Sequence, residues 1–263
     1  MIDSHCHLDA AAFDADRAEV LDRAAAAGVR GLLIPAIRPR TWPALAALPD
    51  RHPAAPLAIA LGIHPQVVPE LDAAELATVD DLAAAIAAAR TPRTVAVGEC
   101  GLDGATGARD LQERVLRAHV RAARALGLPL VVHVLRAHDL APRVLAEERA
   151  GDVGGVLHSY SGPPELVPIY RDLGFTFSFA GPVTWANARK PLAAARAVPA
   201  ALLLAETDAP DQAPAAHRGG RSEPAMVADV IAGLARARDE DPRTIAEQTA
   251  ANARRVFAAA TWW

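Results

Sequence analysis

The stretch MIDSHCHLDA, residues 1–10, places two histidines one residue apart directly after a short apolar start. On a β-strand, residues i and i+2 point to the same face. His5 and His7 would therefore project together, with Cys6 on the opposite face, whereas on a helix the two imidazoles would diverge. The spacing predicts a first strand that ends in two imidazoles, whose partners must come from the rest of the chain.

Seven further segments have the character of buried strands. Most are short, continuous apolar runs, which are typical of parallel strands covered on both faces. With the first stretch included, the predicted strands span residues 1–7, 31–37, 56–64, 94–100, 128–134, 154–160, 175–181 and 201–208.

Alanine-rich, amphipathic stretches separate these strands and predict helices. The clearest ones span residues 14–28, 73–90, 111–127, 223–240 and 242–257. Eight βα repeats in about 260 residues predict a distorted (β/α)8 TIM barrel, whose active site forms at the C-terminal face of the strands. A doubly wound open sheet is the alternative that the same alternation allows. No linker or low-complexity segment divides the chain, so we expect one domain over residues 1–263.

The composition narrows the class of protein. The formal net charge of −4 gives no global basic footprint for an extended nucleic-acid binder, although a nuclease that grips a strand end stays possible. Two cysteines, Cys6 and Cys100, are too few for a disulfide framework, and we expect both as buried thiols. No apolar run is long enough to span a membrane, and the polar residues at positions 3–7 do not resemble a secretory signal. We therefore expect a cytoplasmic, monomeric protein with no membrane or stable protein partner.

Polar side chains stand where the predicted strands end, which is where a barrel builds its active site. They are His5, His7, His64, Glu99, His133, His158 and Asp208. Taken singly, each has an ordinary structural explanation, such as a paired core histidine or a helix cap at Asp208. Without His64, the set offers four imidazoles and two carboxylates, enough for two divalent metal ions with open coordination positions. The nitrogen-rich donors favour Zn, Mn, Fe or Ni over Mg, and Glu99 is our candidate for a bridging carboxylate.

The motifs that carry these residues resemble the TatD-type metal-dependent hydrolases of the amidohydrolase-like superfamily. The matching stretches occur in the family's order over nearly the whole chain. They are DSHCHLD (3–9), GIHP (62–65), AVGECGLD (96–103), LPLVVH (128–133), VLHSYSG (156–162) and LLAETDAPD (203–211). The resemblance implies a deoxyribonuclease that hydrolyses phosphodiesters, with a 3′–5′ exonuclease on single strands or strand ends as the leading hypothesis.

The resemblance also implies roles for the residues. One metal would be held by His5, His7, Glu99 and Asp208, and the second by Glu99, His133 and His158. A water activated by the two metals would attack phosphorus, with Asp208 taking or steering its proton and His64 near the substrate phosphate. Glu206 and Asp103 would orient ligands, and Tyr160 and Ser161 would line the pocket.

The only lysine, Lys190, falls after the seventh predicted strand. Several related amidohydrolases bridge their metals with a carboxylated lysine on the fourth strand, a role that Lys190 cannot fill. This favours a glutamate bridge and the TatD branch. The sequence also departs from the family, because Leu135 stands where an arginine often follows the strand-five histidine, Arg136 comes one residue later, and Leu116 replaces a phenylalanine.

Several alternatives and lesser candidates stay open. The same ligands would serve hydrolysis of an amide, a lactone or an aminoacyl-tRNA ester, and a non-catalytic metal-binding protein is a third hypothesis. We expect His119 and His138 on helices and exposed to solvent, while His217 could reach the pocket from the last loop. Five residues in predicted loops could contact a phosphate, although each could equally be an ordinary polar or charged residue of the surface. They are Asn187, Arg189, Lys190, Arg218 and Arg221.

Overall fold

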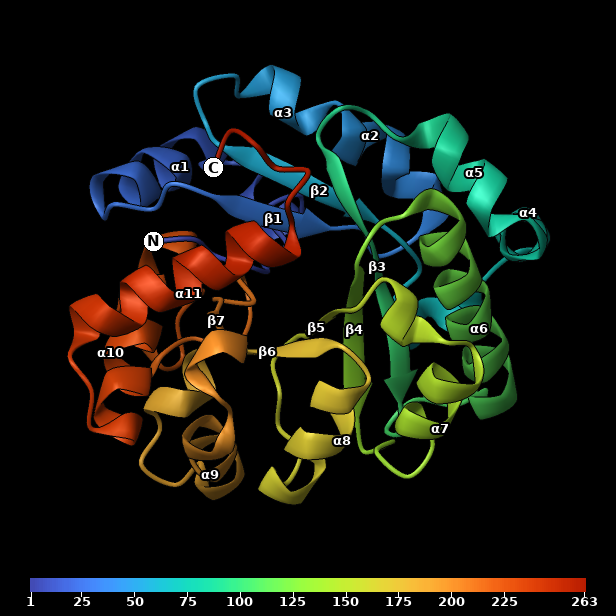
Figure 1. Ribbon diagram of the computed structural model, residues 1–263. Coiled ribbons are helices and arrows are strands. Elements are labelled where there is room, and N and C mark those ends of the chain that lie inside the picture. Colours follow the sequence, from blue (N-terminus) through green and yellow to red (C-terminus); the bar gives the residue numbers. More distant parts are fainter.

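The strands form one parallel sheet in the order of the sequence. In the structure, a computed structural model that describes residues 1–263, each strand pairs with the next one along the chain. Their bounds are β1 (Leu32–Pro35), β2 (Leu57–Leu61), β3 (Thr94–Asp103), β4 (Leu130–Leu135), β5 (Gly155–Leu157), β6 (Phe175–Phe179) and β7 (Leu203–Ala205). The sheet curls, and the helices surround it as a ring (Figure 1). This is the expected distorted TIM barrel.

The first of the eight predicted strands is not a regular strand, which corrects the prediction for residues 1–7. The segment forms a single parallel bridge, from Asp3 to Leu32. It nevertheless lies between β1 and β7 and bonds to both, because the Cys6 N–H donates to the Leu33 carbonyl at 3.0 Å and the Ser4 N–H donates to the Ala205 carbonyl at 3.1 Å. The chain therefore closes the barrel at the eighth position without a continuous ladder.

The side chain of Asp3 explains part of this departure. Its carboxylate accepts the backbone N–H of Thr207 at 2.9 Å and the Thr207 hydroxyl at 2.6 Å. A side-chain acceptor thus takes the place of a backbone partner on the β7 side. Burial raises the pKa of Asp3 to about 8, and the donors from Thr207 oppose that rise.

The helices lie between and around the strands. Their bounds are α1 (Arg17–Ala26), α2 (Trp42–Ala46), α3 (Leu48–Arg51), α4 (Ala73–Asp80), α5 (Leu82–Ala89), α6 (Arg109–Leu126), α7 (Ala141–Glu147), α8 (Val167–Asp172), α9 (Arg189–Ala197), α10 (Val227–Arg238) and α11 (Pro242–Val256). The single helix expected over 73–90 is divided into α4 and α5. Asp81 stands at the break, and its carboxylate accepts the Ala84 N–H and so caps α5.

Alternate residues of the strands enter two different layers of the core. In β1, Leu33 packs inside the barrel, whereas Leu32 and Ile34 pack outward against the helices. The same alternation places Val131 inside and its neighbours outside in β4. Because both faces are buried, the strands read as continuous apolar runs.

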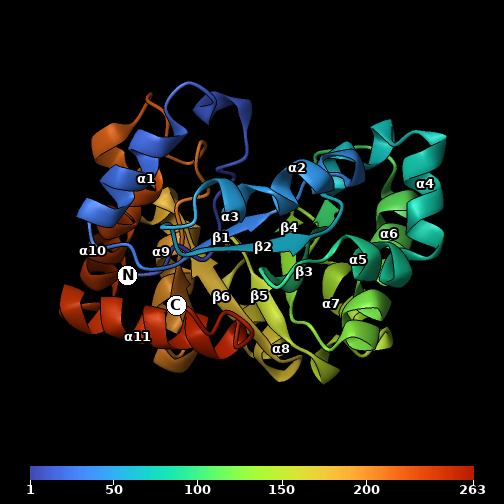
Figure 2. The same cartoon turned by 90° about the horizontal axis from the view of Figure 1, so that it is seen from above.

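One end of the barrel is covered by a helix, and the other end opens onto loops. Helix α11 packs Ala253 and Phe257 against the interior residues near the N-terminal ends of the strands. Both chain termini lie beside this helix (Figure 2). The C-terminal ends of the strands instead open onto loops, where the polar residues gather. None of the helices has the length and apolar character that crossing a membrane requires.

Candidate metal centre

Glu99 occupies a bulge in β3 at the centre of the polar cluster. The register between β3 and β4 shifts between Val97 and Cys100, and a bulge of this kind re-aims a side chain. Gly98 makes it possible, because its φ is +145° and a Cβ there would lie 2.6 Å from the Val131 carbonyl oxygen. The Glu99 side chain is completely buried.

One oxygen of Glu99 faces the N-terminal segment. Its Oε2 lies 3.1 Å from Nε2 of His5 and 3.4 Å from Nε2 of His7. The Oδ1 atom of Asp208, which follows β7, lies 3.5 Å from the same His5 nitrogen and 3.7 Å from that of His7. We call His5, His7 and Asp208 the first half of the site.

The other oxygen of Glu99 faces the middle of the sheet. Its Oε1 lies 3.2 Å from Nδ1 of His133, on β4, and 2.8 Å from Nε2 of His158, which follows β5. Those two nitrogens are 3.0 Å apart. We call His133 and His158 the second half of the site. All six residues predicted as metal ligands are thus brought together, with Glu99 between the halves.

His64 joins the cluster more closely than the sequence indicates. Its Nδ1 accepts the backbone N–H of Gln66 at 3.1 Å, so its Nε2 carries the proton of the neutral ring. That Nε2 lies 2.8 Å from Oε1 of Glu99. His64 therefore stands beside the second half, where it can donate a hydrogen bond.

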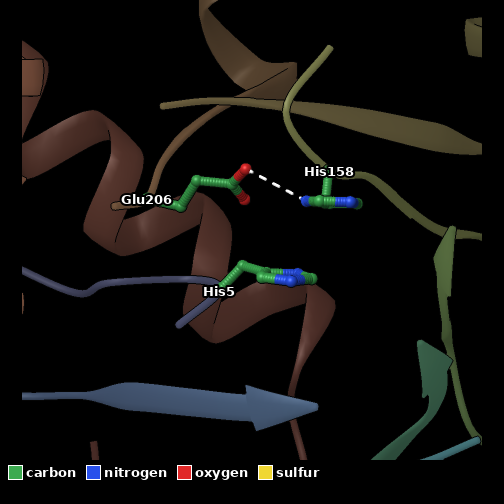
Figure 3. A group of neighbouring side chains, drawn as sticks. All are labelled: His5, His158 and Glu206. Carbon is green, nitrogen blue, oxygen red and sulfur yellow. Dashed lines mark ion pairs between the residues drawn. The ribbon is translucent and has the colours of Figure 1, made fainter. Parts of the chain in front are cut away.

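A carboxylate stands behind each imidazole of the second half. Oε1 of Glu206 lies 3.3 Å from Nδ1 of His158, and Oδ2 of Asp103 lies 3.4 Å from Nε2 of His133. Figure 3 shows Glu206 pointing at His158, whose ring stacks on that of His5 with centroids 3.9 Å apart. A carboxylate on the far nitrogen fixes the orientation of a ligating imidazole and raises its basicity.

Two glutamines that the sequence reasoning missed hold carboxylates of the site. The Gln66 side-chain amide donates to Asp103 at 2.8 Å. The Gln212 amide donates to Oδ2 of Asp208, the oxygen turned away from the imidazoles, and accepts the Ser159 hydroxyl at 2.9 Å. Asp208, Gln212 and Ser159 all have positive φ angles, between 43° and 52°, which are uncommon for non-glycine residues and are found together here beside the candidate site.

The charges within the cluster are strongly coupled. Burial opposes ionisation of Glu99, but the surrounding imidazoles, His158 foremost, hold its pKa well below the usual range. Burial also lowers the pKa of His64 and His5. For His158 the attraction of Glu99 and Glu206 outweighs burial and raises its pKa well above the ordinary value. Protons and cations would therefore compete for the same buried nitrogens.

The donor atoms fit divalent cations. Neighbouring ligands of an ion with bonds of about 2.1 Å are roughly 3.0–3.4 Å apart, close to the spacings found here. Both oxygens of Glu99, although buried, lack a well-directed hydrogen bond, as does Nδ1 of His5. Such groups are costly to bury without a partner, and a cation between them would supply one. Imidazole and carboxylate donors suit transition metals.

Some sequence expectations are wrong. His119 lies on α6 as expected but is completely buried, with Nε2 accepting the Ile63 N–H at 2.9 Å. His138 precedes α7 and is half-buried, 2.9 Å from the Tyr170 hydroxyl. His217 points to Asp229 on α10 rather than into the site.

Other expectations are confirmed. Cys6 and Cys100 are free and buried. Tyr160 and Ser161 line a small cavity together with Ser159 and Gln212, but none of the predicted metal ligands lines it, so their place in a substrate pocket stays a prediction.

Comparison with known proteins gives full-length matches. The family model described as TatD related DNase matches residues 2–258. An uncharacterized metal-dependent hydrolase of Bacillus subtilis (strain 168), YabD, is 32% identical over 260 residues, covering 98% of each chain. The 3′-5′ ssDNA/RNA exonuclease TatD of Rahnella sp. (strain Y9602) is 31% identical over 267 residues, again covering 98% of each. The crystal structure of YjjV, a TatD homologue from Escherichia coli K12, superposes with a TM-score of 0.87 at 31% identity and 98% coverage of both chains.

Proposed function

The chain belongs to the family of TatD-related DNases and is a metal-dependent hydrolase, and from that premise we propose that it is a phosphodiesterase that shortens single-stranded nucleic acid from the 3′ end. The Rahnella relative bears the name of such an exonuclease. The observation that carries the proposal is the bridging position of Glu99, with each of its oxygens directed at a different group of imidazoles.

We assign two divalent cations to this centre. His5, His7, Asp208 and Oε2 of Glu99 would hold one. Oε1 of Glu99, His133 and His158 would hold the other. When bound, two such cations lower the pKa of a water molecule and polarise the phosphodiester that it attacks.

The chain's own residues orient the reaction. Gln212 fixes Oδ2 of Asp208, which leaves Oδ1 turned toward the imidazoles and available to take the proton of the attacking water. His64 has its Nε2–H 2.8 Å from Oε1 of Glu99, beside the second half, and can donate to a phosphoryl oxygen of the substrate there. Asp103 and Glu206 keep His133 and His158 in place throughout.

Replacing Glu99 with alanine tests the mechanism most directly. We expect hydrolysis of a labelled single-stranded oligonucleotide to fall by a factor on the order of 10³ or more, because both cation positions lose a shared ligand. Metal analysis should show loss of bound cation, and a chelator should abolish the wild-type activity. The matched control is Glu148→Gln, at a carboxylate that pairs with Arg121 on the helical surface. Full chelator-sensitive activity in Glu99→Ala would rule out the bridging role.

Substrates with 5′ and 3′ labels distinguish the polarity of digestion. Progressive loss of a 3′ label with a shortening 5′-labelled ladder is the expected result. Amides, lactones and aminoacyl-tRNA offered in parallel test the other hydrolytic classes. Turnover of one of them, with none on any phosphodiester, would replace the proposal.

A further inference from the structure

The loops around the mouth of the barrel differ in charge from one side to the other. On the segments that follow β4, β6 and β7, including the start of α9, four cations are exposed and make no hydrogen bond or ion pair with the protein. They are Arg136, Arg189, Lys190 and Arg218. Two free, exposed carboxylates share this side, Glu165 and Asp211. Residues 181–205 include three basic residues and no acidic one.

On the opposite side, formed by the N-terminal segment and the loops after β1 and β2, the arginines are mostly neutralised. Arg17 pairs with Asp14 at 2.6 Å, and Arg38 pairs with Glu75 at 2.5 Å. Arg40 is the exposed exception. The free positive charge of the mouth is therefore concentrated on the β4–β7 side, although the net charge of the whole chain is −4.

Helix stability does not explain the placement of two of these cations. Arg189 and Lys190 begin α9, and its first turn contains no acidic residue. Cations at this end of a helix interact unfavourably with the helix dipole. They are also close to the site, because the next residue, Pro191, lines the same small cavity as Ser159 and Gln212.

An aromatic ring lies on the same side. The Trp185 indole follows β6, is half-buried, and donates its Nε1–H to the Ala213 carbonyl at 3.0 Å. The Arg218 guanidinium carbon is 4.9 Å from the ring centroid. Ala213 directly follows Gln212, whose side-chain amide donates to Asp208 of the first half. The Trp185 ring is therefore bonded to the residue next to Gln212.

We infer that the β4–β7 side of the mouth is the track for the nucleic-acid strand. The phosphates follow Arg136, Lys190 and Arg218, and one base stacks on Trp185. This combination of a cationic groove with an aromatic platform is how proteins bind single strands without reading their sequence. The inference rests on the proposed function for the class of substrate, and it adds the path that this substrate takes.

Binding of a fluorescein-labelled phosphorothioate (dT)20 to the purified protein, followed by fluorescence anisotropy over a series of salt concentrations, tests the track. The triple variant Arg136→Ala/Lys190→Ala/Arg218→Ala should bind more weakly. The slope of log K against log salt should also fall by about 2, since each lost phosphate contact of a single strand contributes roughly 0.7. The control is Arg40→Ala/Arg51→Ala/Arg90→Ala, which removes equal charge from exposed, unpaired arginines outside the track. Equal affinities and slopes for the two triple variants would overturn the inference.

The aromatic platform has its own test. Trp185→Ala should raise KM for the oligonucleotide roughly tenfold, while Trp185→Phe, which keeps an aromatic face but loses the hydrogen bond to Ala213, should raise it less. The ratio of kcat/KM for the oligonucleotide to that for bis(p-nitrophenyl) phosphate should fall in Trp185→Ala, because the small diester reaches no platform. An unchanged ratio would remove Trp185 from the track. If the wild type hydrolyses neither substrate, the proposed function fails, while the anisotropy comparison still decides the track.

Discussion

The two halves of the candidate metal centre are carried by different kinds of structure. The second half lies on β4 and directly after β5, which are paired within the parallel sheet. The first half takes both imidazoles from a segment that touches its neighbours through one bridge and scattered hydrogen bonds. The geometry of the second half is therefore set by the ladder, and that of the first by closure of the barrel.

The halves also differ behind the imidazoles. Each ring of the second half faces a carboxylate with its far nitrogen, Asp103 for His133 and Glu206 for His158. In the first half, Nδ1 of His5 and of His7 makes no ion pair with a carboxylate, although Glu206 also lies within 4.8 Å of a His5 nitrogen. The first half has Asp208 as an additional anionic donor instead. We conclude that cation binding in the second half would depend on the buried carboxylates behind its imidazoles. In the first half it would depend on the placement of Asp208.

The largest effect in this comparison should come from Glu206→Gln. The substitution keeps an acceptor for the Ser159 N–H, which donates to Glu206 at 2.6 Å, but removes the charge behind His158. Cation affinity of the second half should fall roughly 10–100-fold, and that of the first half by less, because Glu206 pairs with His158 and only lies near His5. Calorimetric titration with Mn²⁺ separates the two binding steps. Loss of affinity in both steps alike would contradict the proposed division.

Gln212→Leu should act on the other half, and more weakly, because no charge is lost. Freed from its amide partner, Asp208 can turn its Oδ1 away from the imidazoles. We expect a loss of roughly tenfold in kcat/KM, confined to kcat, together with weaker cation binding in the first half. Gln66→Leu makes the corresponding change in the second half, because the Gln66 amide donates to Asp103. Gln248→Leu, on α11 and away from both halves, is the control that should leave activity unchanged. A selective effect on the second half from Gln212→Leu would reverse the assignment.

Thr207→Val tests how the N-terminal segment is held. The variant removes the hydroxyl that donates to the buried carboxyl of Asp3 at 2.6 Å. We expect a loss of about 1–3 kcal/mol in the free energy of unfolding, measured with urea. Thr176→Val on β6 removes a neutral hydrogen bond to the Gly155 carbonyl at 2.9 Å and should cost about 1 kcal/mol. If the two variants are equally stable, the segment does not depend on Asp3.

The smallest effect is a pH dependence that arises outside both halves, at His119. Burial lowers the pKa of His119 to about 4, and its ordinary value is 6.5. The unfolded chain therefore binds more protons between these values, so this contribution to stability is complete above about pH 6.5 and is lost as the pH falls toward 4. Between pH 7 and about pH 5.5 the loss should be about 1 kcal/mol. Urea unfolding of His119→Gln should lack this part of the pH dependence, and an identical profile would contradict it.

Much of the site was predictable because its donors follow local patterns. His133 ends an apolar strand, and His5 and His7 share one face wherever that segment is extended. The burial of His119 was not predictable, because its neutral ring is held by the backbone N–H of Ile63, which is far from it in the sequence. Gln66 and Gln212 were missed for the same reason, since amide side chains gain meaning only from the carboxylates that they touch.

The sequence by itself indicated the alternation of strands and helices and the six candidate donors at the strand ends, because apolar periodicity and i, i+2 spacing are properties of neighbouring residues. Only the tertiary structure decided that the two oxygens of Glu99 face different imidazole pairs and that the far nitrogens of one pair form ion pairs with carboxylates. It also decided that the free cations collect on one side of the mouth. These features depend on the bulge in β3 and on contacts between loops that are far apart in the chain. Such contacts form only when the barrel closes.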